Sequence, residues 1–182
     1  MADFVFSAKF TSKGMQTYRK QITYAISGGL NDAGRKIFTQ VRRQLRDQTG
    51  AKKYSTITSR TWVRSSTPLT LAYAICANPY PVDIAEFGAA VVSRGISASP
   101  WQNGRVFAQS FQNLKWAKFG NTGGYFQRLG PSRFPIRPLH GPNLGKELMG
   151  LTPGSEVPQL VVAQAIAMLP SAIAVRVNRI KL

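Results

Sequence analysis

The chain has 182 residues, of which 24 are Lys or Arg and only 7 are Asp or Glu, so its formal net charge is +17. This length favours a single domain, residues 1–182, and a hydrophobic content of 43% is enough for a buried core. One cysteine excludes an internal disulfide framework, and one Cys with one His is too few for a zinc site. The excess of positive charge is expected to seek an acidic partner: nucleic acid, anionic lipid or an acidic protein.

Residues 1–10 alternate between apolar and mixed positions, which is typical of a strand or of an extended arm. They contain neither a basic leader nor an apolar stretch of signal-peptide length, so we expect the protein to fold in the reducing cytoplasm. The pattern of residues 11–50 is helical, with Thr11 or Ser12 as a candidate N-cap. The pair Gly28-Gly29 predicts a break or a kink in this helical region.

The segment Leu30–Gln48 predicts an amphipathic helix. At about 100° per residue, an apolar stripe falls on one side and a set of cations on the opposite side. The stripe consists of Ala33, Ile37, Val41 and Leu45, and the cations are Arg35, Lys36, Arg42, Arg43 and Arg46. We call these five cations the ridge. Thr49-Gly50 is expected to end the helix after its basic last turn.

The middle of the chain, residues 67–140, is predicted to be mainly an antiparallel sheet. Before it, Tyr54–Ser66 fits a short helix about as well as a strand, and we favour the helix. Leu69–Ala77 alternates as a mostly buried strand would, which predicts a buried structural role for Cys76. Further extended segments are expected at Val91–Ser99, Arg105–Phe111, Gly124–Leu129 and Phe134–Leu139, since clusters of Gly, Pro and Asn separate them.

Residues 155–182 form a C-terminal helical segment that is apolar along most of its length. Pro170 is expected to kink or end this helix before a basic tail. Val157–Val175 is rich in alanine and contains two prolines and two glutamines, so we expect it to be buried or to face another subunit, and not to enter a membrane. The predicted fold is therefore α+β: an N-terminal amphipathic helix packed on a mainly antiparallel sheet, with a C-terminal apolar helix.

Groups that could perform catalysis are few, and the sequence predicts no catalytic, cofactor-binding or metal-binding residues. His140 lies between prolines, where backbone hydrogen bonding is the favoured role. Asp83 and Glu86 could share one face of a helical turn as an acid/base or metal pair, but salt bridges to arginines of a neighbouring subunit explain them better. The segment Gly141–Glu147 ends unlike a phosphate-binding loop, because Glu147 stands where Ser or Thr would hold Mg²⁺.

The remaining functions are binding and assembly. The ridge could follow the phosphates of DNA, or it could simply be a solvated face. Because no zinc finger, RNA-binding aromatic signature or helix-turn-helix is recognisable, any contact with nucleic acid is expected to be non-specific.

Three segments resemble the family of the bacteriophage lambda minor tail protein Z: Val106–Ala108, Gly124–Arg128 and Arg133–Asn143. In that family an aromatic-containing strand leads through a glycine turn to an arginine-bearing strand, a Pro-Ile pair and a Gly-Pro step. The matching residues are Arg128, Pro135, Ile136, Gly141 and Pro142. The helix Leu30–Gln48 and the segments Pro81–Phe87 and Ser93–Ser97 are also similar to the family, whereas Asn113–Asn121 departs from its pattern.

This resemblance implies a tail completion protein of the virion, located at the head-proximal end, or neck, of a phage tail and needed for head-tail joining. It further implies a homo-oligomer, expected as a sixfold ring, whose neighbours are tail terminator, tail tube or head-tail connector proteins. Non-specific contact with packaged DNA is compatible with such a place, and neither a cofactor nor a membrane is expected. The alternative is a basic DNA-binding accessory protein.

Overall fold

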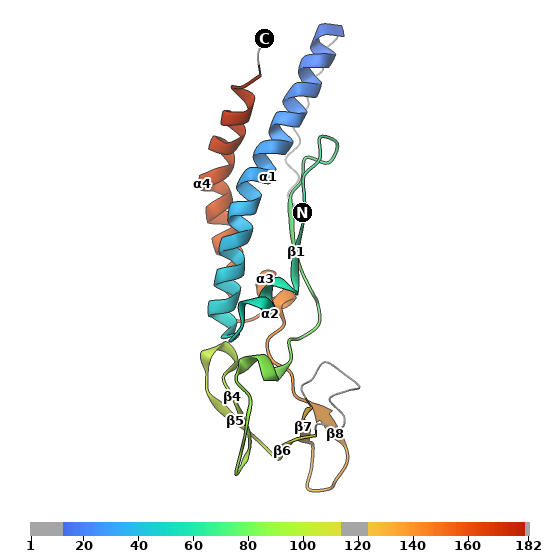
Figure 1. The fold of residues 1–182 in the computed structure, drawn as a ribbon, viewed down its shortest axis with the longest axis vertical. Coiled ribbons are helices and arrows are strands. Elements are labelled where there is room, and N and C mark those ends of the chain that lie inside the picture. Colours follow the sequence, from blue (N-terminus) through green and yellow to red (C-terminus); the bar gives the residue numbers. More distant parts are fainter. Residues whose placement is uncertain (1–12, 114–123, 181–182) are drawn as a thin grey trace.

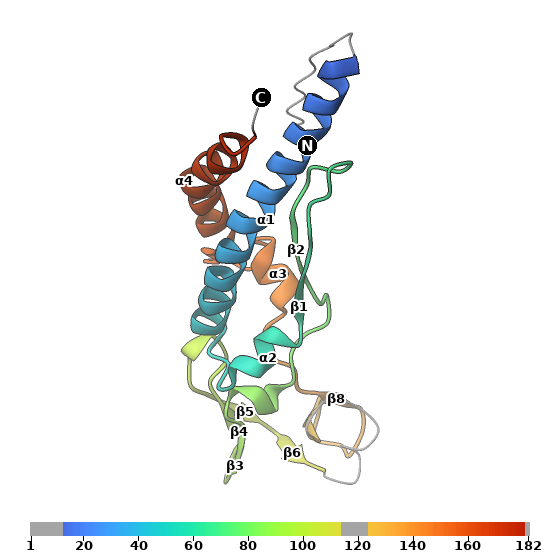
Figure 2. The same cartoon turned by 45° about the horizontal axis from the view of Figure 1, so that its top comes forward.

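A computed structural model describes residues 13–113 and 124–180, with the side chains of residues 13–17 left aside. The predicted arm or strand of residues 1–10, the N-caps Thr11 and Ser12, and nearly all of Asn113–Asn121 lie outside the described residues. The fold is α+β, as predicted, with a long N-terminal helix and a C-terminal apolar helix. The molecule is elongated: two long helices lie side by side along its axis, two three-stranded sheets gather at one end, and a two-stranded hairpin extends alongside the helices (Figures 1 and 2).

The N-terminal helix α1 spans Lys13–Thr49 without interruption. The predicted break at Gly28-Gly29 is therefore wrong, and the reason for Gly29 is packing. A Cβ atom on Gly29 would lie 2.8 Å from the Cα atom of Ile173 in the C-terminal helix. The end of α1 is as predicted, because Gly50 adopts a φ of 75° and donates its N–H to the carbonyl of Arg46.

The apolar stripe of α1 is confirmed as its buried face. Ala33, Ile37, Val41 and Leu45 are at most 5% exposed. Toward the end of the helix they join one core cluster that includes Ile57, Ile84, Phe87, Ile96, Leu144 and Val157. The most extensive partner of α1 is nevertheless the C-terminal helix, which lies antiparallel to it.

The segment after α1 divides into a helix and a strand. Tyr54–Thr58 forms α2, and Thr61–Arg64 forms β1, which pairs antiparallel with β2 (Ala74–Ala77). The predicted strand Leu69–Ala77 is thus confined to its last four residues, and Leu69, at 96% exposed, lies in the connecting loop. Cys76 is half-buried and not buried as predicted, because the β1–β2 hairpin is a two-stranded ribbon with one face open.

The other strands form two antiparallel meanders instead of one continuous sheet. The first contains β3 (Ala90–Val92), β4 (Gly95–Ala98) and β5 (Arg105–Ala108), and the second contains β6 (Ser110–Gln112), β7 (Tyr125–Arg128) and β8 (Ile136–Pro138). Each predicted extended segment contains one or two of these strands. Two short 3₁₀ helices accompany the first meander: η1 (Ile84–Phe87) precedes β3, and η2 (Pro100–Gln102) lies between β4 and β5.

The C-terminal part contains α3 (Leu144–Leu148) and α4 (Val157–Val177). Asn143 caps α3 by accepting a hydrogen bond from the N–H of Lys146, so the segment Gly141–Glu147 leads into a short capped helix. Helix α4 continues past Pro170 to Val177, and the prediction that it could end at this proline is therefore wrong. The proline costs one backbone hydrogen bond, but packing on α1 continues beyond it, since Ile173 meets Gly29.

Candidate interaction surfaces

Four of the five ridge cations lie on one exposed side of α1. Arg35, Lys36, Arg43 and Arg46 are all exposed, and they lie away from the core cluster. Acidic residues border this surface at both ends, since Asp32 pairs with Arg35 at 3.3 Å and Asp47 follows Arg46 directly. The positive charge of the exposed ridge is therefore partly compensated by these two carboxylates.

Arg42 does not belong to the exposed ridge. Its guanidinium donates to the side chain of Thr61 at 2.9 Å, to the carbonyl of Thr61 at 2.7 Å and to that of Thr58 at 3.3 Å. The same group lies 3.9 Å from the centre of the Phe38 ring. Arg42 thus fixes α2 and the start of β1 against α1, a role that helical periodicity alone could not reveal.

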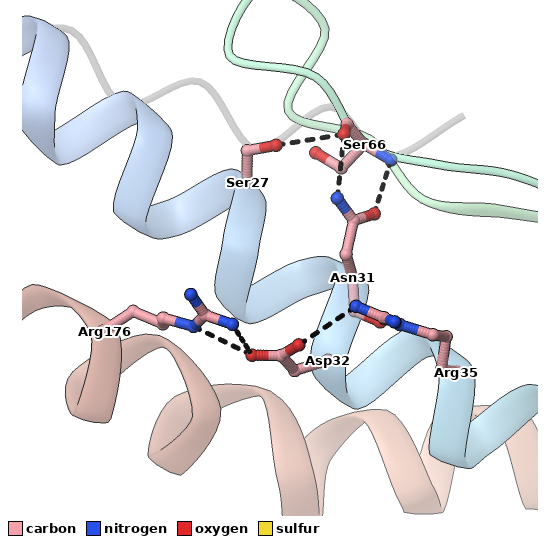
Figure 3. A network of polar contacts seen from close by, with 6 residues as sticks. All are labelled: Ser27, Asn31, Asp32, Arg35, Ser66 and Arg176. Carbon is pink, nitrogen blue, oxygen red and sulfur yellow. Dashed lines mark hydrogen bonds and ion pairs between the residues drawn. The ribbon is translucent and has the colours of Figure 1, made fainter.

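A polar junction holds α1 to both of its neighbours near the middle of the helix (Figure 3). The amide of Asn31 donates to the carbonyl of Ser66 at 2.9 Å and accepts from its N–H at 2.8 Å, and Ser27 donates to the same carbonyl. On the other side, Arg176 of α4 donates twice to one carboxylate oxygen of Asp32, at 2.6 and 2.8 Å. The hairpin loop and the end of α4 are therefore both fixed to one turn of α1.

The outer face of α4 is apolar and exposed. On a helix, residues three and four apart share a face, and the exposed positions of α4 follow this spacing. We define the outer face as Val162, Ala163, Ile166, Ala167, Pro170, Ser171, Ala174 and Val175. Val162, Ile166 and Val175 are 58%, 73% and 52% exposed, and no charged residue occurs between Glu156 and Arg176. A contiguous exposed apolar face of this kind is typical of an interaction surface.

The outer face continues into an apolar groove of roughly 460 Å³ between α1, the β1–β2 hairpin, α3 and α4. Val162 lines the groove from α4, and Met149, which is 65% exposed, lines it beside α3. Tyr73 lines it from the hairpin, where burial raises the pKa of its hydroxyl. Gly34 allows this ring to approach α1, because a Cβ atom there would lie 2.6 Å from it.

By length and composition alone, α4 is also apolar enough to cross a membrane. None of the residues in its most apolar stretch is fully buried within the chain. The prediction of a buried helix is therefore wrong for the single chain, since α4 covers only one of its faces with α1. Whether another subunit covers its outer face stays a prediction.

Asp83 and Glu86, which the sequence places three residues apart, have separate roles within the chain. Asp83 caps η1 by accepting from the N–H of Ala85 at 3.0 Å, and Glu86 accepts from the hydroxyl of Thr56 at 2.7 Å. Burial raises the pKa of Asp83 to about 6, partly offset by its hydrogen bond from Ala85 and reinforced by the charge of Glu86. In residues 13–113 and 124–180, no three Cys, His, Asp or Glu side chains lie close enough together to hold a metal ion.

Glu147 forms a polar connection that the sequence did not predict. Its carboxylate is fully buried and accepts from the indole N–H of Trp101 at 2.8 Å and from the amide of Gln48. Gln48 in turn accepts from the backbone N–H of Glu156, just before α4, at 3.3 Å. These contacts join the ends of α1 and α3, η2 and the start of α4.

The residues that carry the family resemblance meet in two places. Arg128 of β7 lies opposite Ile136 of β8 in the register of the second meander, and Pro135 precedes that strand. Gly141 packs on the ring of Phe87, since a Cβ atom there would lie 2.2 Å from it, and the carbonyl of Pro142 accepts from the N–H of Val82 at 2.9 Å. Each motif residue therefore has a structural role in this chain.

His140 lies beside this Gly-Pro step. Its backbone forms an isolated antiparallel bridge with Asp83. Burial lowers the pKa of its side chain.

Comparison of the chain with protein-family models, with curated proteins and with solved structures found no match. The function must therefore be inferred from the surfaces themselves. The outer face of α4 could have been found from the sequence, because 19 consecutive residues there carry no charge. A second signal is the absence of Asp and Glu from the 60 residues between Glu86 and Glu147.

Proposed function

We propose that this protein is a structural component of a phage virion: a tail completion protein that forms a ring at the neck and is needed for head-tail joining. It acts by binding and assembly, without a cofactor, and is made in the host cytoplasm. Its neighbours in the virion are tail terminator, tail tube or head-tail connector proteins. The resemblance of residues 106–143 to the minor tail protein Z family gives the biological setting.

The observation that carries this proposal is the outer face of α4. A helix that is apolar all round is usually buried on all sides, yet α4 packs on α1 with one side only. The polar junction at Asp32 and the connection through Glu147 hold α4 at both ends, so this face is presented by a fixed helix. A second copy of the chain is the occupant we favour, because a ring needs a surface of each copy to contact its neighbour.

The oligomeric state tests this proposal directly. Sedimentation of the purified chain should give a stable oligomer, and Ile166→Glu should reduce it to monomers, because a carboxylate would be desolvated in the interface. Ile166 is 73% exposed within one chain, so the variant should keep its fold. Gln21→Glu adds the same charge at an exposed position of α1 and is the matched control.

A membrane would give a different pattern. If the wild-type chain sediments as a monomer and floats with lipid vesicles through α4, the ring proposal is wrong. The virion setting is tested by electron microscopy of particles made without this protein. Intact heads beside unjoined or misfinished tails are expected, whereas normal virions would contradict the proposal.

The second candidate, a DNA-binding accessory protein, is favoured by the unbalanced charge. Among the described residues, Arg35 and Arg176 are the only cations in ion pairs, and both share Asp32. A soluble accessory protein of this kind would be a monomer or dimer that binds duplex DNA with a steep dependence on salt.

A further inference from the structure

We propose that the end of the molecule formed by β3–β8, and not the ridge on α1, is the surface that contacts the phosphates of duplex DNA. This inference rests on the DNA contact considered in the second candidate function and assigns it to a different surface. It does not depend on whether the chain forms a ring.

All charged residues in the sequence of this end are positive. The 60 residues between Glu86 and Glu147 contain eight Lys and Arg and no Asp or Glu. Six of these cations are described and exposed: Arg94, Arg105, Arg128, Arg133 and Arg137 on the strands and loops of this end, and Lys146 in α3. Figures 1 and 2 show β3–β8 together at one end of the long axis, opposite the free ends of α1 and α4.

Three of these arginines are held in place without using their hydrogen-bond donors. The guanidinium of Arg105 lies 4.5 Å from the centre of the Phe107 ring, that of Arg128 lies 5.1 Å from Phe111, and that of Arg133 lies 5.7 Å from Phe134. An arginine that stacks on an aromatic ring keeps its N–H groups in the plane of the guanidinium, where they can bind phosphate oxygens. Loss of side-chain entropy on binding is thereby reduced.

The uniform charge favours a nucleic acid over an acidic protein. An interface with an acidic protein fixes its register by matching discrete patches of complementary charge. A surface of one sign suits a polymer whose phosphates repeat uniformly along its length. The ridge fits this description less well, because Asp32 holds Arg35 and Asp47 follows Arg46.

Arg94 extends the surface to the tip of a hairpin. It occupies the two-residue turn between β3 and β4, in which Val92 lies opposite Gly95. Arg137 contributes less, because its guanidinium donates to the amide oxygen of Gln127 at 2.8 and 3.2 Å. The phosphate contacts are therefore assigned mainly to Arg94 and to the three stacked arginines.

The experiment compares two triple variants with the same change of charge. One replaces Arg105, Arg128 and Arg133 with Gln, and the other replaces Lys36, Arg43 and Arg46 of the ridge with Gln. Binding of a labelled DNA duplex is followed by fluorescence anisotropy between about 50 and 200 mM salt. Circular dichroism checks that each variant is folded, and a triple Arg→Lys variant at the three stacked positions keeps the charge.

The first variant should reduce the slope of log K against log salt concentration by about 2.7, since each phosphate contact contributes about 0.9. The ridge variant and the Arg→Lys variant should keep most of the wild-type slope. Equal losses in the two Gln variants, or a larger loss in the ridge variant, would overturn this inference. Competition by polyglutamate at the same charge concentration would indicate an acidic protein as the partner and also overturn it. If the wild-type chain does not bind DNA at all, the second candidate function fails together with the inference.

Discussion

Gly28 and Gly29 are neighbours in the middle of α1, yet the same substitution should affect them in opposite ways. A Cβ atom on Gly29 would lie 2.8 Å from the Cα and 2.9 Å from the N atom of Ile173, which are backbone atoms of α4. On Gly28 it would meet only the side chain of Arg176, at an ordinary distance of 3.6 Å. Gly28→Ala and Gly29→Ala therefore form a matched pair.

The expected magnitudes follow from two effects. Replacing glycine by alanine inside a helix stabilises it by about 1 kcal/mol, because the unfolded chain loses less backbone entropy. At Gly29 the new methyl group must push two helix backbones apart, and overpacking of this kind costs about 1–3 kcal/mol. Gly28→Ala should thus stabilise the protein. The free energy of unfolding of the Gly29→Ala variant should be about 1–3 kcal/mol lower than that of the Gly28→Ala variant.

Thermal unfolding followed by circular dichroism measures this difference at a fixed protein concentration, because any oligomer makes the transition depend on concentration. For a chain of this size, 1 kcal/mol shifts Tm by about 2–4 °C. If both variants raised Tm by the same amount, α1 and α4 would not be packed at Gly29, and the reasoning would be refuted.

Three further predictions concern other contacts. Asn31→Ala should destabilise the protein by about 1–3 kcal/mol in urea unfolding, because the N–H of Ser66 in the hairpin loop loses its partner and the Ser66 carbonyl keeps only the bond from Ser27; unchanged stability would mean that the loop is not held by Asn31. Because the folded-state pKa of Asp83 is raised from 3.8 to about 6, the folded protein retains this proton over a pH range in which the unfolded chain has lost it, so stability should fall as pH rises between those values. Asp83→Asn, which keeps the cap, should remove that part of the pH dependence, and identical profiles would contradict the shift. Gly141→Ala should cost about 1–3 kcal/mol by overpacking against Phe87, whereas Gly130→Ala, with open space around its Cβ position, should be nearly neutral in the same thermal assay.

The sequence predicted those features that depend on local periodicity. The stripe from Ala33 to Leu45 identified the buried face of α1, because its spacing of three and four residues places these side chains on one side of any α-helix. The end of α1 at Gly50 follows from glycine's tolerance of a positive φ. Neither feature needs a distant contact.

Features that depend on a distant partner could not be predicted in this way. Arg42 and Arg43 are neighbours on the predicted cationic side of α1. Only the guanidinium of Arg42 forms hydrogen bonds with Thr61, which belongs to another element. Likewise, glycine weakens a helix locally, so the sequence Gly28-Gly29 predicts a break. Only the folded structure shows that the backbone of α4 approaches α1 closely at Gly29.

The sequence by itself therefore determined the α+β class, the C-terminal end of α1, and the sign and uneven distribution of charge. The tertiary structure decided which cations remain free, how the strands divide into two meanders and a hairpin, and which side of α4 stays exposed. The physical reason is the range of the interactions. Periodicity and backbone preference act over a few neighbouring residues, whereas the bond between Arg176 and Asp32 joins positions far apart in the chain and exists only after folding.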